Sequence, residues 1–149
     1  MSVYAGGCSC GAVRFEVRDY LYVLVCHCDA CKKRTGSAFG ISVVVSDAAV
    51  SRLTGTTKTF TRIAETGRPV DYVFCPVCAS TIYWKIKKVP DWTIFAGGAF
   101  DDVHTMPAAG AMYDEHALSW ARPQCALSHI GEPDEAFRAA LIEEANRLR

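Results

Sequence analysis

Seven of the eight cysteines lie in three short groups whose spacing is typical of metal ligands. The groups are the pair in "GGCSCGAV", the triple in "CHCDAC" and the pair in "FCPVCAS", and Cys125 stands apart from them. A Cys-x-x-Cys pair on a tight turn after a strand directs two thiolates to one point, as a tetrahedral zinc site requires. Two pairs far apart in the sequence can together close a four-cysteine site and fasten two parts of the chain.

Seven clustered thiols do not make two four-cysteine sites, and they divide naturally as four plus three. The division with the best chemistry assigns a closed structural site to four residues: Cys8, Cys10, Cys75 and Cys78. It leaves a site with three ligands and one open position, which is the arrangement of a catalytic zinc, to Cys26, Cys28 and Cys31. The fourth ligand there would be water or the substrate. The sequence leaves a second division open, in which "CHCDAC" shares Cys75 and Cys78.

Other uses of these residues are also open. His27 and His104 could fill the open position, but side-chain alternation is expected to point His27 away from the metal, and His104 reads as a solvated or hydrogen-bonded loop residue. A redox-active Cys-x-x-Cys normally begins a helix in a βαβ setting, which this sequence does not show. Cys125 is expected to be a buried, unreactive thiol.

The composition is that of an ordinary globular protein of 149 residues, half of them hydrophobic. Lysine and arginine balance aspartate and glutamate, 16 against 16, so no basic field favours nucleic acid or an anionic membrane as a partner. The N-terminus lacks a signal-peptide layout, and the longest apolar run, "YLYVLVC", is too short to span a bilayer. We therefore expect a cytoplasmic protein, in which eight cysteines indicate metal or catalysis; secretion would instead favour disulfides.

The elements that must position the cysteines are mostly short strands. "AVRFEVR" (12–18) alternates apolar and charged residues as a half-buried strand does. Further β-branched and aromatic runs predict strands at 20–26, 39–45, 57–63, 70–74, 81–86 and 91–100. The only helix predicted is at about 133–148, with Pro133 in its first turn beside Asp134 and Glu135. The prediction is a mainly β, single domain over residues 1–149 with a C-terminal helix.

The order Cys-x-Cys, Cys-His-Cys-x-x-Cys and Phe-Cys-x-x-Cys, with "TIFAGGAFDD" beyond, resembles the glutathione-dependent formaldehyde-activating enzyme family, which includes the centromere protein V domain. The resemblance runs from about Tyr4 to Trp120. It implies a tent-like fold of small sheets pinned by zinc, and the first division of ligands given above. One departure is Ala79, which stands where the family usually has glycine, so that turn must avoid a positive φ or carry mild strain.

The resemblance also implies an activity, the joining of glutathione and formaldehyde to S-hydroxymethylglutathione, which is carbon–sulfur lyase chemistry. Glutathione carries two carboxylates, and the basic residues just after the triple are candidates to bind them: Lys32, Lys33 and Arg34. Arg62 and Arg68 are weaker candidates, and a solvated basic turn is the simpler alternative. Candidates for proton transfer, each more often structural, are Asp29, Asp101 and His104.

Two other functions fit parts of the pattern. A non-enzymatic zinc module that binds a protein or carries metal would also use paired cysteines, with the second metal closed by a protein ligand. A zinc-stapled reductase similar to the B type of methionine sulfoxide reductase would need Cys125 as its reactive thiol. The sequence does not indicate an oligomeric state.

Overall fold

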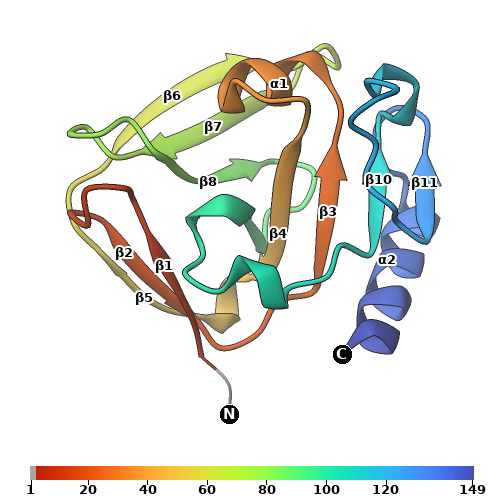
Figure 1. Ribbon diagram of the computed structural model, residues 1–149. Helices are drawn as coiled ribbons and strands as arrows, with labels where there is room; N and C mark the ends of the chain where they lie inside the picture. Colours follow the sequence, from red (N-terminus) through yellow and green to blue (C-terminus); the bar gives the residue numbers. More distant parts are fainter. Residues whose placement is uncertain (1–2) are drawn as a thin grey trace. The chain divides into compact units, whose positions relative to one another are not determined.

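The computed structural model describes residues 3–149, which form eleven strands and two α-helices (Figure 1). The chain is therefore mainly β, with a C-terminal helix, as predicted. It divides into two compact units. Unit 1 comprises Met1–Tyr20 and Val44–Val103, and unit 2 comprises Leu21–Val43 and His104–Arg149. The expectation of one domain over the whole chain stays a prediction, and each unit is described by itself.

In unit 1, three antiparallel strands lie in the order β1 (Tyr4–Gly7), β2 (Arg14–Val17) and β5 (Val50–Thr54). Val13, Phe15 and Val17 are fully buried, which confirms the alternation predicted for this segment. The Phe15 ring packs against Phe95 with 4.5 Å between ring centroids. This apolar packing holds the loop between β1 and β2, which carries the first cysteine pair.

Unit 1 also contains an antiparallel ladder of four strands: β9 (Trp92–Ala96), β8 (Thr81–Ile86), β7 (Pro69–Phe74) and β6 (Lys58–Ile63). All four were predicted, but β9 ends before residue 100 because Gly97–Ala99 form a 3₁₀ turn closed by the Phe100 N–H on the Gly97 carbonyl, 3.1 Å away. The turn from β7 to β8 carries the second cysteine pair. A further predicted strand, β4 (Gly40–Ser46), has its first residues in unit 2 and its last in unit 1.

Unit 2 contains the triple-cysteine segment between β3 (Tyr22–Cys26) and the short helix α1 (Asp29–Thr35). Strand β10 (Gly110–Met112) pairs in parallel with both β3 and β11 (Leu127–His129). Every residue of β3 is buried, as its apolar sequence indicated. Helix α1 was not predicted, because its seven residues bury only Cys31 and so show no apolar periodicity.

The C-terminal helix α2 (Glu135–Leu148) contacts β3 within unit 2. Its N-cap is Asp134, whose carboxylate accepts a 2.7 Å hydrogen bond from the Phe137 N–H. Pro133 therefore precedes the helix instead of lying in its first turn. Leu141 is fully buried on the inner face of α2. Over the described part of the chain, neither helix combines the length and the apolar character that crossing a membrane requires.

Candidate metal sites

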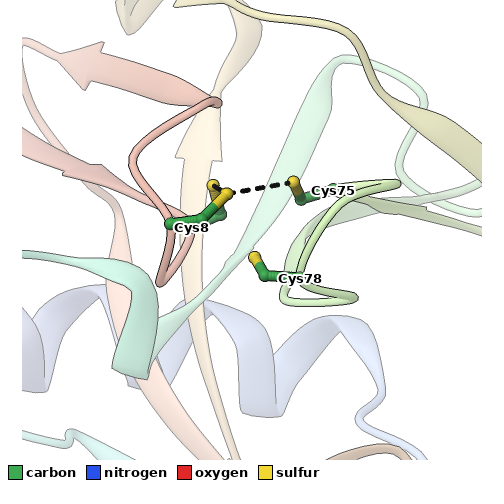
Figure 2. Close-up of side chains that lie close together, drawn as sticks. Cys8, Cys75 and Cys78 are labelled. Atoms are coloured by element: carbon green, nitrogen blue, oxygen red, sulfur yellow. Dashed lines mark hydrogen bonds between the residues drawn. The ribbon is translucent and has the colours of Figure 1, made fainter.

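The four-cysteine cluster lies in unit 1, where two tight turns face each other (Figure 2). The sulfur atoms of Cys8, Cys10, Cys75 and Cys78 all lie within 4.8 Å of one another. In the first turn, the Gly11 N–H donates to the Cys8 carbonyl at 3.0 Å. In the second, the Ala79 N–H donates to the Cys75 carbonyl at 2.9 Å. These backbone bonds fix the two pairs so that their thiols converge.

Ala79 adopts a φ of 60°, the left-handed conformation that glycine favours. The turn therefore does not avoid a positive φ, and it carries the mild strain that the sequence left as one of two outcomes. The tight turn after Cys78 is kept even though the residue there has a Cβ.

Ser80 joins the two turns of this cluster. Its Oγ lies 3.2 Å from the Cys78 sulfur and accepts a hydrogen bond from the Ser9 N–H at 3.1 Å. Hydrogen bonds from the Ser80 hydroxyl and backbone lower the pKa of Cys78 to about 5. The pKa of Cys10 is shifted in the opposite direction, to about 12. A backbone hydrogen bond at Ala12 lowers this pKa, but contact with Cys8, burial and the other two thiols together raise it by more. Thiolates this close repel one another, and a cation among them would remove that repulsion.

The three-cysteine cluster lies in unit 2 at the junction of β3 and α1. Cys26 ends β3, Cys28 is the N-cap of α1, and Cys31 follows in the first turn, with all three sulfurs within 4.8 Å. The Cys31 N–H donates to the Cys28 sulfur at 3.4 Å. Cys26 and Cys31 are buried and Cys28 is half-buried, so Cys28 has the most solvent-accessible side chain of the three.

Mutual contact also shifts the pKa values in this cluster. Contact with Cys28 and Cys31, followed by burial, raises the pKa of Cys26 far above its usual range. For Cys31, contact with Cys26 lowers the pKa, but Cys28 and burial raise it to about 11, and the charge of Arg34 opposes that rise. These thiols ionise together only if positive charge compensates them. The cluster is thus suited to a metal ion.

The two clusters are those of the first division of the seven cysteines. Cys75 and Cys78 group with Cys8 and Cys10 inside unit 1, and in residues 3–149 no histidine or carboxylate joins either cluster. Thiolate donors in sets of four and three fit zinc, a borderline-soft cation that prefers sulfur and nitrogen ligands. The chain therefore contains one four-cysteine and one three-cysteine cluster that could hold zinc.

The histidines considered for the open position lie elsewhere. His27 is fully buried, with its ring edge-on to Phe39 at 5.7 Å between centroids. Neither ring nitrogen has a hydrogen-bond partner among the described residues, and burial lowers the pKa of the ring, which keeps it neutral. His104 is exposed in a 3₁₀ turn.

The three basic residues that follow the cluster have different environments. The Lys32 ammonium donates to the His116 carbonyl at 2.7 Å and lies 3.5 Å from Asp29. Lys33 is exposed. Arg34 is half-buried beside Cys31, and nothing in the sequence distinguishes it from the two lysines in this respect.

The remaining candidates interact with neighbours within their own units. Asp101 accepts hydrogen bonds from the Arg14 guanidinium, one of them at 3.1 Å, and this contact holds its pKa below the usual range. Arg62 donates to the Tyr72 hydroxyl at 3.1 Å. Cys125 is half-buried and not fully buried as expected, and burial followed by the charge of Asp114 raises its pKa. A thiol with a raised pKa is a poor nucleophile at neutral pH.

The fold and clusters together define a mainly β protein with two cysteine clusters of the zinc-binding type. The family model of the glutathione-dependent formaldehyde-activating enzyme matches residues 3–116, and the chain belongs to this family. The match includes both clusters and ends at His116, so β11, α2 and Cys125 lie outside it.

A crystal structure of a Rhodobacter sphaeroides protein has a similar fold, with a TM-score of 0.53 and 20% sequence identity. The similarity covers 66% of this chain and 88% of that one. No curated protein matches the chain in a sequence comparison.

Proposed function

We propose that this protein is a zinc-dependent carbon–sulfur lyase acting on a glutathione-type thiol adduct, such as S-hydroxymethylglutathione formed from glutathione and formaldehyde. The observation that carries the proposal is the three-cysteine cluster, in a chain of this family, with two buried thiols and one half-buried thiol. Three protein ligands and one open position are the usual arrangement of a catalytic zinc, whereas four-cysteine sites are structural.

In this proposal Cys26, Cys28 and Cys31 hold the metal that takes part in the reaction. Zinc bound there would supply a soft Lewis acid with an open position for a substrate thiol, whose pKa it would lower. The chain fixes the ligands through the end of β3 and the first turn of α1. Cys8, Cys10, Cys75 and Cys78 then form the structural site, which fastens the β1–β2 loop to the β7–β8 turn.

The reaction forms a bond between the thiol sulfur and the aldehyde carbon, while the carbonyl electron pair moves to oxygen and takes up a proton. The thiol proton balances that uptake, so no oxidant or reductant is needed. Orientation of the two small reactants supplies the rate gain, because it makes the encounter effectively unimolecular. Among the candidate carboxylate partners, exposed Lys33 is best placed for glutathione, since Lys32 already donates to the His116 carbonyl.

The test is the rate of S-hydroxymethylglutathione formation, measured by exchange NMR against the uncatalysed reaction. We expect zinc-loaded protein to accelerate the reaction and Cys28→Ser to remove the acceleration while the fold and the other zinc remain. Cys125→Ser is the matched control and should stay active; loss of activity in this variant would contradict the assignment of the reaction to the three-cysteine cluster. Zinc-loaded protein that neither accelerates the reaction nor binds the thiol would contradict the proposal and favour a non-enzymatic zinc module.

A further inference from the structure

Arg34 lies against the three-cysteine cluster inside unit 2. A Cβ built on Gly40, the first residue of β4, would stand 2.8 Å from Arg34 Nη2 and 3.5 Å from Cys31 Sγ. The guanidinium and the sulfur therefore approach the same point, over backbone that has no side chain. Gly40 has no side chain, so the space beside it stays open to both groups.

The position of Arg34 differs from that of the other cations on the same helix. Its Nε and Nη2 atoms are shielded from solvent, so its charge acts through a medium of low dielectric constant. The Lys32 ammonium donates a hydrogen bond to the His116 carbonyl. Lys33 is exposed, so water screens its charge. Of these three residues, Arg34 is the one whose charge is both shielded and next to a cluster sulfur.

The charge of the proposed metal site explains what such a residue could do. Three thiolates exceed the charge of a divalent zinc ion by one negative unit. A substrate thiolate in the open position would bring the excess to two units. An adjacent positive charge that is partly shielded from solvent offsets part of that excess. A residue that neighbours a metal ligand commonly changes metal affinity about 10-fold to 100-fold.

We propose that Arg34 is a positioning residue of the three-cysteine site. It stabilises the anionic metal cluster and allows the open position to accept a fourth thiolate, that of the substrate. The part concerning the thiolate rests on the proposed function; the part concerning the metal does not. Arg34 then acts through Cys31 and does not bind the carboxylates of glutathione.

The first experiment measures metal affinity and needs no substrate. Chelator competition is followed through the sulfur-to-cobalt charge-transfer band in cobalt-loaded wild type, Arg34→Gln, Arg34→Lys and Lys33→Gln. We expect Arg34→Gln to weaken the three-cysteine site about 10-fold, Arg34→Lys to lie closer to wild type, and Lys33→Gln to match wild type. Equal affinity in wild type and Arg34→Gln would overturn the proposal, as would equal losses in Arg34→Gln and Arg34→Lys, since the lysine keeps the charge.

The second experiment titrates the same proteins with 2-mercaptoethanol, which has no carboxylate, and with glutathione, at saturating cobalt. We expect Arg34→Gln to bind both thiols about 10-fold more weakly, and Lys33→Gln to bind 2-mercaptoethanol normally. Weaker binding of glutathione alone in Arg34→Gln would make Arg34 a carboxylate partner and overturn the assignment. If wild type binds neither thiol, the proposed function fails, while the metal-affinity result still decides the role of Arg34 toward the cluster.

Discussion

At the scale of single residues, Ala79 holds a left-handed conformation that costs a residue with a Cβ about 1–2 kcal/mol. We predict that Ala79→Gly raises the free energy of unfolding of the zinc-loaded protein by about 1 kcal/mol, measured by chemical denaturation. Ala48→Gly is the control, because Ala48 is exposed in a 3₁₀ turn without a positive φ and should lose stability. Loss of stability in both variants would contradict the strain at Ala79.

Ser80 stabilises the thiolate of Cys78 and bonds to the backbone of the opposite turn. We therefore predict that Ser80→Ala weakens zinc binding at the four-cysteine site about 10-fold, measured by chelator competition in a Cys28→Ser background. Ser9→Ala is the matched control, because it keeps the Ser9 N–H and the contact of Ser80 with Cys78. Similar losses in both variants would mean that the serine pair, and not the Cys78 contact, stabilises the site.

The raised pKa of Cys125 gives a prediction about pH. Because its pKa lies above the ordinary thiol value of 9.0, its thiolate fraction at any lower pH is smaller than that of a free cysteine. Iodoacetamide should therefore label Cys125 in the zinc-loaded protein more slowly than free cysteine at pH 8, and the rate should keep rising beyond pH 9. Cys125→Ser identifies the labelled site. Labelling at neutral pH as fast as that of free cysteine would instead indicate an activated thiol.

At the scale of elements, helix α2 begins where Asp134 accepts the Phe137 N–H. Asp134→Ala should lower the free energy of unfolding by about 1 kcal/mol, because one N–H of the first turn loses its partner. Asp134→Asn keeps an acceptor and should stay within a few tenths of a kcal/mol of wild type in the same denaturation series. Equal losses in the two variants would assign the effect to charge instead of the cap.

The predicted strands are those with a run of alternating or continuous apolar residues. The missed strands lack such a run: β1 reads "YAGG", β5 reads "VSRLT", and β10 and β11 have three residues each. Tertiary contacts define these elements, as at Gly6, where an added Cβ would lie 2.4 Å from the Phe15 ring and 2.3 Å from the Ala99 carbonyl oxygen. Helix α1 lacks a start signal as well as apolar periodicity, since its N-cap is a cysteine thiol, which is not among the usual capping groups.

At the scale of the whole molecule, the members of each cysteine pair and of the triple could be predicted, because a local turn fixes each group. Which two pairs combine depends on the folded chain, and the sequence alone left two divisions open. The environments of the basic residues could not be predicted. "KKR" places three similar charges side by side in the sequence, and only the folded chain separates shielded Arg34 from Lys32 and exposed Lys33. Spacing identifies candidate ligands, while packing decides which neighbours act on them.

The central claim is that both clusters hold a metal, and zinc content per chain tests it most directly. Mass spectrometry of freshly purified protein should give two zinc ions for wild type, one for each cluster, and one for Cys28→Ser and for Cys75→Ser. The Cys28→Ser variant should keep its fold, because the four-cysteine site fastens unit 1 without it. One zinc in wild type that is retained in Cys28→Ser would contradict the account, since Cys26, Cys28 and Cys31 would then not be a working metal site.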